Sequence, residues 1–150
     1  MGVLLASVLT LVLVSATVLI HYEVLRWTNR LVPELALSMR TRILVVIGSI
    51  LFAHLAEICV FALAYFMMHD RLGIGSITGE VSGRWLDFFY FSASTYTTLG
   101  VGDVVPTGVL RVVAGVESLT GLVLIGWSAS YTYLTMQDSW SQPRGPTTPV

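Results

Sequence analysis

The sequence predicts an all-α membrane protein with three membrane-spanning helices and a short re-entrant segment between the second and the third. Its composition is 55% hydrophobic and 11% charged, whereas soluble domains carry about 25% charged residues. The mean hydropathy is +0.79. Three long apolar stretches follow one another, and a shorter aromatic stretch ends in a glycine-containing motif. A chain of 150 residues has room for one compact unit.

Each of the three stretches is long enough to cross a bilayer, which takes about 20 mostly apolar residues. They run from Val3 to Ile20, from Ile43 to Met68 and from Val109 to Tyr133. No basic residue precedes the first stretch and no small-residue cleavage site follows it, so we expect a retained helix rather than a signal peptide. The acidic, basic and histidine residues inside the other two stretches are His54, Glu57, Arg111 and Glu117.

The distribution of arginine predicts the orientation, because cytoplasmic loops are rich in basic residues. The loop between the first two helices carries four arginines, so we expect it in the cytoplasm, with the N-terminus outside and the C-terminus cytoplasmic. Residues 69–108 then face outside. Within the loop, Leu31–Met39 is expected to form a short interfacial helix starting near Pro33. The proline-containing tail Ser139–Val150 is expected to be disordered. The arginines are Arg26, Arg30, Arg40 and Arg42; Trp27 and Trp140 fall near the inner interface and Trp85 near the outer one.

The segment between the second and third helices is the most informative part of the sequence. Trp85–Tyr96 is apolar and aromatic but too short to span a membrane, and Thr97–Asp103 (TTLGVGD) follows it. Non-helical backbone at membrane depth is tolerated only where protein buries it or where it lines a water-filled path. The pattern therefore predicts a re-entrant helix followed by an extended loop that lines such a path.

The loop has the residues that ion coordination by backbone carbonyls requires. An ion that leaves water needs its hydration shell replaced, and consecutive carbonyls aimed at one axis can do this. Directing the carbonyls to the same side requires unusual backbone angles, which Gly100 and Gly102 can adopt at little steric cost. Thr98 adds a hydroxyl oxygen, and the C-terminal end of the preceding helix favours a cation. Asp103 is placed to tie the loop to that helix or to attract cations to the mouth.

The motif Thr97-Thr98-Leu99-Gly100-Val101-Gly102-Asp103 resembles the signature T-T-V-G-Y-G-D of the potassium channel superfamily. Pro106 follows at the family's usual place, and the resemblance covers about residues 82–135. It implies that K⁺ binds at oxygens of Thr98, Leu99, Gly100 and Val101, with Gly102 at the outer mouth. It also implies aromatic packing around the filter by Tyr90 and Phe91, and a candidate hinge at Gly121 in an inner helix that starts near Arg111. With Thr97, Asp103 and Glu117, these two aromatic residues make up the expected filter support.

The resemblance also implies the organisation of the whole protein. The family assembles four such modules around an axis, so we expect a homotetramer in the lipid bilayer. The expected parts are an N-terminal membrane helix and cytoplasmic loop (1–42), a pore module (43–135) and a disordered cytoplasmic tail (136–150). We expect passive potassium conduction across a plasma membrane. The small size of the protein favours a bacterial inner membrane. Neither a cofactor beyond bound K⁺, nor enzyme activity, nor a nucleic-acid partner is expected.

The motif departs from the family pattern in ways that leave one alternative open. Val101 stands in place of the aromatic residue that helps to hold the filter width, so a non-selective monovalent cation channel is the alternative function. Leu99 in place of valine is a mild change. Ser94 stands where some relatives carry a carboxylate, so Asp103 is expected to take a hydroxyl or indole partner.

Two sets of residues outside the motif have both structural and functional interpretations. For Glu117 we favour a hydrogen bond to the re-entrant helix, at Ser94 or Thr95, over lining of the conduction path. His54 and Glu57 share a helix face, and we favour a satisfied polar pair over a proton-sensitive one. The proton-sensitive alternative predicts conductance that changes between about pH 5 and 7 and is insensitive to pH in Glu57→Gln.

Two remote alternatives remain for the function. Gly100-Val101-Gly102-Asp103 matches the G-x-G-D motif of intramembrane aspartyl proteases, but that chemistry needs two adjacent aspartates at membrane depth. No aspartate lies inside the other predicted spans. An accessory membrane subunit without a pore of its own would have no need of the intact motif.

Overall fold

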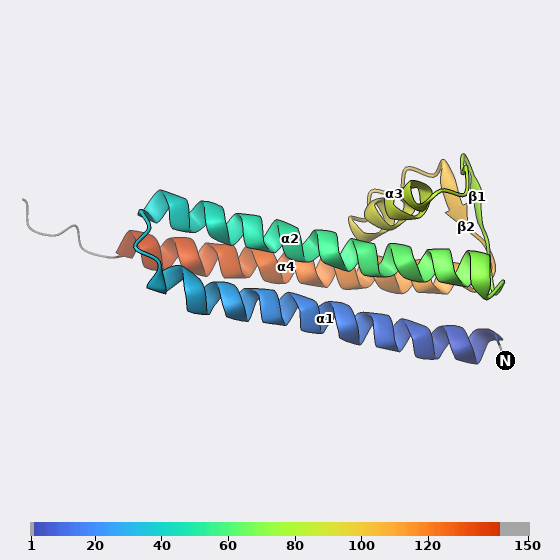
Figure 1. Cartoon of the computed structure of the whole chain (residues 1–150), viewed down its shortest axis with the longest axis horizontal. Helices are drawn as coiled ribbons and strands as arrows, with labels where there is room; N and C mark the ends of the chain where they lie inside the picture. Colours follow the sequence, from blue (N-terminus) through green and yellow to red (C-terminus); the bar gives the residue numbers. More distant parts are fainter. Residues whose placement is uncertain (1, 142–150) are drawn as a thin grey trace, which may run out of the picture.

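The computed structural model describes residues 2–141 as three long helices lying side by side, with a small subdomain at one end (Figure 1). The small subdomain holds a short helix and two short strands, all inserted between the second and third long helices. The chain forms α1 (Gly2–Glu34), α2 (Met39–Phe66), a π-helical turn η1 (Met67–Arg71), β1 (Ile77–Gly79), α3 (Trp85–Tyr96), β2 (Val104–Pro106) and α4 (Leu110–Ser141).

The three long helices match the three predicted spans. Each is long and apolar enough to cross a membrane, over Leu4–Glu34, Met39–Arg71 and Leu110–Gln137. The N-terminus of α1 lies at the same end of the bundle as α3 and the strands, whereas the α1–α2 connection and the C-terminal end of α4 lie at the other end (Figure 1). This arrangement agrees with three successive crossings, with the insertion on the side of the N-terminus.

Helix α1 is longer than predicted, and the expected loop over residues 21–42 is mostly helical. The link to α2 comprises only residues 35–38, and the predicted interfacial helix Leu31–Met39 is wrong because its first four residues complete α1. Charged residues end an apolar stretch but not a helix, since arginine and glutamate are good helix formers. Arg26 donates to Glu23 over 2.8 Å on the helix surface, and Pro33 falls in the last turn.

Helix α4 is also longer than predicted. It continues to Ser141, so residues 136–141 are helical rather than part of a disordered tail. The first proline after the start of α4 is Pro143, so no proline interrupts the helix before that position. The rest of the expected tail, residues 142–150, lies outside the described residues.

A two-stranded antiparallel sheet was not part of the all-α prediction. Ile77 pairs with Pro106 and Gly79 with Val104. The backbone N–H of Glu80 donates to the carbonyl of Asp103 over 3.1 Å. A Cβ on Gly79 would lie 2.1 Å from that same carbonyl oxygen, so glycine permits the close approach. The sheet therefore holds the end of the 97–103 loop.

Helix α3 packs into the angle between α2 and α4 through one apolar face. Its buried residues recur at the spacing of an amphipathic helix, and they are Phe88, Phe91, Ser92 and Tyr96. The ring of Phe91 meets that of Tyr65 on α2 edge to face, with centroids 4.9 Å apart. The main core cluster joins this face to residues of α1, α2 and α4, including Ala6, Phe61 and Val113. Helix α3 is thus anchored along its length.

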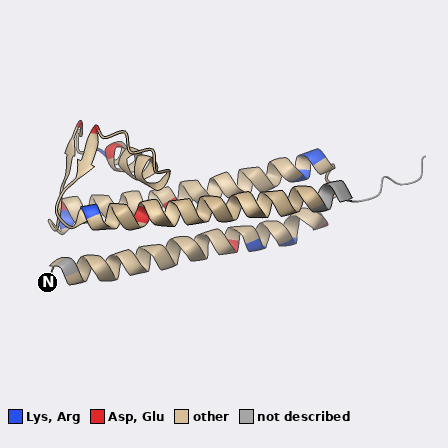
Figure 2. Cartoon of the chain, turned by 180° about the vertical axis from the view of Figure 1, so that it is seen from behind, with Lys and Arg blue, Asp and Glu red and all other residues tan. Residues whose placement is uncertain are grey.

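Charged residues gather near the two ends of the bundle (Figure 2). Arginines mark the end of α1 and the start of α2, away from α3. The acidic residues Asp70, Glu80, Asp87 and Asp103 belong to the η1–β2 region at the opposite end. Between the ends, Glu57 and Glu117 are fully buried.

Candidate functional site

The 97–103 loop starts where α3 ends, and the start of α3 is fixed by Asp87. Its carboxylate accepts hydrogen bonds from the backbone N–H of Ser82 over 2.8 Å and of Arg84 over 3.0 Å, and from the Ser82 hydroxyl over 2.9 Å. These three bonds lower the pKa of Asp87, and the bond from the Ser82 hydroxyl contributes most. A carboxylate in the first turn also suits the helix dipole.

The backbone of the loop alternates in φ. Thr98 has φ +59°, Gly100 +57° and Gly102 +90°, and among the described residues Thr98 is the only non-glycine with positive φ. The intervening Leu99 and Val101 therefore have negative φ. Ordinary strand geometry points successive carbonyls to opposite sides, whereas alternation of left- and right-handed residues turns them toward one side. The structure thus has the unusual backbone that the sequence predicted, with a threonine sharing the role of the glycines.

The loop is tied to α3 from one side only. The N–H of Gly100 donates to the carbonyl of Ser94 over 3.2 Å, and the N–H of Val101 to the Ser94 hydroxyl over 3.3 Å. The other side of the loop is open, and all seven residues from Thr97 to Asp103 are exposed. Leu99 is 70% and Val101 55% exposed.

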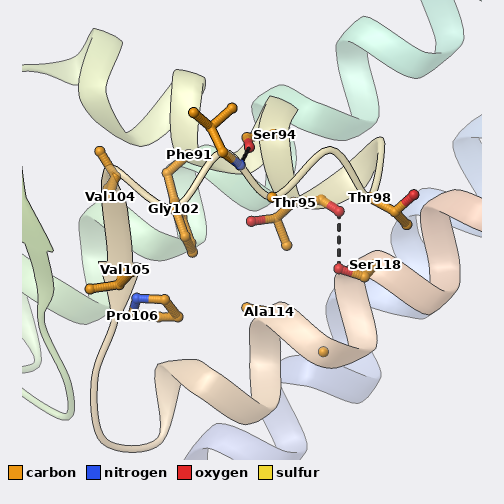
Figure 3. Close-up of a pocket in the computed structure, with 13 residues that line it drawn as sticks. Phe91, Ser94, Thr95, Thr98, Gly102, Val104, Val105, Pro106, Ala114 and Ser118 are labelled. Atoms are coloured by element: carbon orange, nitrogen blue, oxygen red, sulfur yellow. Dashed lines mark hydrogen bonds between the residues drawn. The ribbon is translucent and has the colours of Figure 1, made fainter.

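Asp103 closes the loop through Tyr90. The Tyr90 hydroxyl donates to Oδ2 of Asp103 over 2.9 Å, which is the hydroxyl partner that the sequence predicted. This bond raises the pKa of Tyr90. Phe91, the second predicted aromatic, points into the core beside Tyr65 and also lines a pocket between the loop and α4 (Figure 3). Across this pocket the Ser118 hydroxyl donates to the carbonyl of Thr95 over 3.0 Å.

Glu117 of α4 is fully buried behind α3. It accepts hydrogen bonds from the hydroxyl of Ser92 over 2.6 Å and of Tyr65 over 2.5 Å. The predicted partners, Ser94 or Thr95, are wrong because the side chain of Ser94 is on the loop side of α3, where it holds Val101. A hydrogen bond from α4 to α3 is nevertheless present.

Gly121 lets α4 approach the end of α3. A Cβ at this position would lie 2.1 Å from the carbonyl oxygen of Tyr96. This contact accounts for glycine here by close packing. Helix α4 runs unbroken through the position.

A model of the ion channel family matches residues 43–138, which is more than half of the chain. The chain belongs to this family of ion channels. The match covers α2, α3, the loop and α4, and it supports membership of the potassium channel superfamily. No curated protein matches the chain. Helix α1 lies outside the family match, so its role in this channel rests on its own contacts.

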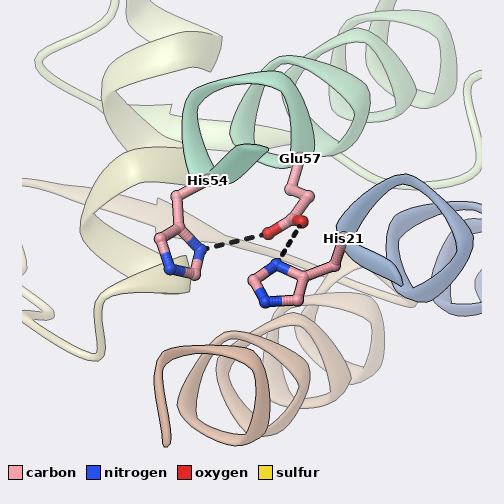
Figure 4. Close-up of side chains that lie close together, drawn as sticks. All are labelled: His21, His54 and Glu57. Atoms are coloured by element: carbon pink, nitrogen blue, oxygen red, sulfur yellow. Dashed lines mark hydrogen bonds and ion pairs between the residues drawn. The ribbon is translucent and has the colours of Figure 1, made fainter. Parts of the chain in front are cut away.

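Those contacts form a polar cluster that the sequence revealed only in part (Figure 4). His54 and Glu57 of α2 are in contact as predicted, with Nδ1 of His54 3.2 Å from Oε2 of Glu57. His21 of α1 was not assigned to this site, and its Nδ1 lies 2.9 Å from Oε1 of Glu57. The Tyr96 hydroxyl donates to the same carboxylate. The signal that could have found His21 is its position beside an uncharged apolar stretch, where an ionisable side chain is costly without a partner.

Proposed function

We propose that the chain is one subunit of a homotetrameric, potassium-selective channel, in which backbone oxygens of residues 98–101 and the Thr98 hydroxyl carry the ion. The observation that carries this proposal is the alternating φ of Thr98, Gly100 and Gly102 in an exposed loop at the C-terminal end of α3. The expected mechanism is passive, single-file movement down the electrochemical gradient.

The chemistry of the loop favours a cation that has lost its water. Carbonyl oxygens turned to one side replace the hydration shell, and closely spaced sites let one ion repel the next. Helix α3 ends directly at the loop, and its C-terminal end carries partial negative charge. Asp103 adds a carboxylate at the far end of the loop, where it raises the local cation concentration. No covalent step is needed.

In a tetramer, the loop and the apolar surface that are exposed in a single chain would be covered. The loop is supported on its α3 side and open on the other, so four copies facing a common axis would enclose an ion path between them. The exposed apolar side chains of α4, such as Val112, Leu119 and Val123, would then face other copies or lipid.

The orientation follows from the arginines at the α1–α2 end of the bundle. Basic residues gather on the cytoplasmic side, so we place this end and the C-terminal end of α4 in the cytoplasm of a plasma membrane. The loop and the acidic residues of the η1–β2 region then face outside. Exposed Trp27 and Trp85 belong to the inner and outer interfaces respectively.

A non-selective monovalent cation channel is the second candidate. It is favoured by Val101, whose side chain is 55% exposed and has no hydroxyl or ring with which to brace the loop. Tyr90 is engaged with Asp103 at the end of the loop instead. The protease alternative is weaker, because Asp103 lies in an exposed loop and is held by Tyr90.

Ion flux into liposomes separates these possibilities. Purified protein is reconstituted, and K⁺ and Na⁺ gradients are run in parallel for the wild type, Gly100→Asp and Gly48→Ala. Gly100→Asp is expected to abolish flux, because aspartate strains a residue at φ +57° and puts a side chain into the path. Gly48→Ala is the matched control, since a Cβ there meets no atom within 4 Å. Absence of flux from a verified tetramer in both gradients would count against conduction, and equal K⁺ and Na⁺ flux would favour the non-selective channel.

A further inference from the structure

The polar cluster contains side chains from all four α-helices, α1, α2, α3 and α4. It contains His21 of α1, His54 and Glu57 of α2, Tyr96 of α3 and Ser128 of α4. His21 and Glu57 are fully buried, and Tyr96 and Ser128 are at most 5% exposed. The side chain of His54 is 14% exposed, which makes it the least buried member of the cluster.

The cluster is arranged around one carboxylate. Nδ1 of His21 faces Oε1 of Glu57 over 2.9 Å, and Nδ1 of His54 faces Oε2 over 3.2 Å (Figure 4). Both imidazoles thus aim the same ring nitrogen at the same group, from two different helices. The two rings lie 5.2 Å apart, centroid to centroid. Three potential ligand atoms, one from each residue, lie within 4.8 Å of one another.

The outer nitrogens of the two rings also share one partner. Nε2 of His21 lies 3.2 Å, and Nε2 of His54 3.0 Å, from the hydroxyl oxygen of Ser128. This oxygen has two lone pairs and can accept an N–H from each ring. Both Nδ1 atoms are then free of hydrogen and have their lone pairs directed toward the carboxylate. In this tautomer all three groups are acceptors, and one cation bound between them would satisfy all three.

The distances suit a small divalent cation. Metal–nitrogen and metal–oxygen bonds of about 2.0–2.2 Å in a tetrahedron put neighbouring ligand atoms about 3.3–3.5 Å apart. The two ring-to-carboxylate distances, 2.9 and 3.2 Å, are slightly shorter than that value, and the ligand atoms of the three residues lie within 4.8 Å of one another, so side-chain movement alone would bring them to one ion. The Tyr96 hydroxyl oxygen, 2.8 Å from Nδ1 of His54, is a fourth ligand atom at the same point. Metal-bound histidines usually donate their second N–H to a polar oxygen, which is the place of Ser128.

We propose that His21, His54 and Glu57 form a binding site for one divalent transition-metal ion of the zinc class in each chain, with Tyr96 and Ser128 completing it. Imidazole and carboxylate together select such metals over K⁺, Mg²⁺ or Ca²⁺, which prefer oxygen ligands alone. The site is separate from the ion path, and it does not depend on conduction.

The site is connected to the 97–103 loop through Tyr96. Tyr96 is the last residue of α3, and Thr97 begins the exposed loop. A metal held by α1 and α2 that also engages Tyr96 fixes the point where the loop starts. Helix α1, which lies outside the family match over residues 43–138, thereby gains a specific contact with the matched region through His21.

The test is metal binding by the purified tetramer in detergent, measured without any flux. The protein is stripped with a chelator, titrated with Co²⁺ and followed by the visible absorption of tetrahedral cobalt, and Zn²⁺ content is measured by elemental analysis after desalting. We expect about one ion per chain, displacement of Co²⁺ by Zn²⁺, and loss of both signals in Glu57→Gln and His21→Gln. His69→Gln is the matched control, because His69 lies outside the cluster and accepts from the N–H of Ile77.

Two further readouts keep the test decisive if the buried variants fail to assemble. Ser128→Ala removes only the oxygen behind the rings and is expected to weaken Co²⁺ binding by about 10–100-fold. Wild-type tetramer that binds no Co²⁺ or Zn²⁺ would overturn the proposal and leave a proton as the cation of the cluster. Equal binding by wild type and Glu57→Gln, or binding lost in His69→Gln alone, would overturn it as well.

Discussion

The hydroxyl oxygen of Tyr65 on α2 lies 2.5 Å from a carboxylate oxygen of Glu117 on α4, and neither side chain is exposed. The other carboxylate oxygen of Glu117 accepts from Ser92 of α3 over 2.6 Å. One side chain thus joins the three helices that carry the loop, directly behind it. The bonds lie away from the open side of the loop, so their role is to hold the support rather than to touch the ion.

Removal of the Glu117 carboxylate is expected to weaken this support. Glu117→Ala leaves the buried Tyr65 hydroxyl without its acceptor, at about 1–3 kcal/mol, whereas the Ser92 hydroxyl can still donate to the carbonyl of Ile58 over 2.9 Å. Thermal unfolding of the protein in detergent measures the loss. Glu23→Ala is the control, because its exposed ion pair with Arg26 contributes about 1 kcal/mol or less. Equal unfolding midpoints for the two variants would contradict the role given to Glu117.

Gly121 is expected to be needed for packing. In Gly121→Ala the added methyl would meet the backbone of Tyr96, and overpacking costs about 1–3 kcal/mol even where side chains can move. Chromatography and thermal unfolding of the purified protein should show lower stability or failed assembly. Gly126→Ala is the control, since a Cβ there meets no atom within 4 Å. A stable Gly121→Ala tetramer with changed gating would instead favour the hinge.

The bond between Tyr90 and Asp103 is expected to influence ion selectivity more than folding. Tyr90→Phe removes the hydroxyl but keeps the ring, so the end of the loop loses its side-chain anchor to α3. We expect increased Na⁺ flux relative to K⁺ flux in liposomes, with an unchanged unfolding midpoint. Tyr133→Phe, at a residue of α4 that is 65% exposed, is the control. Unaltered selectivity in Tyr90→Phe would show that the sheet alone holds Asp103.

The sequence predicted the parts of this fold that depend on long apolar runs and on an extended motif. The three spans, α3 and the unusual backbone of Gly100 and Gly102 follow from residue type and spacing, whereas the positive φ of Thr98 was not predicted. The ends of α1 and α4 could not be predicted in this way, because polar residues such as Arg30 in α1 and Gln137 in α4 interrupt the apolar pattern but not the helix.

Contacts between distant residues were the other part that could not be predicted. Glu57 and His21 are 36 positions apart, and only the packing of α1 on α2 brings them together. The two strands have three residues each, too few for an alternating pattern to be recognised. The partner of Glu117 depended on which face of α3 meets α4, and Ser92 and Ser94 could not be told apart before that face was known.

Acid is expected to loosen the start of α3. The pKa of Asp87 is lowered in the folded protein. The stabilisation by Asp87 is therefore complete at pH values above its unfolded pKa of about 3.9. This stabilisation is lost as the pH falls through the lower, folded value. The unfolding midpoint of the wild type, measured from pH 5 downward, should therefore fall further than that of Asp87→Asn. Parallel curves for the two proteins would contradict the capping role.

The reversal potential under bi-ionic conditions, with K⁺ on one side of a planar bilayer and Na⁺ on the other, tests the central claim most directly. We expect a strongly displaced reversal potential, with the K⁺ side negative relative to the Na⁺ side, and loss of the current in Gly100→Asp but not in Gly48→Ala. A reversal potential near zero with a robust current would contradict potassium selectivity and show that Val101 leaves the path open to both ions.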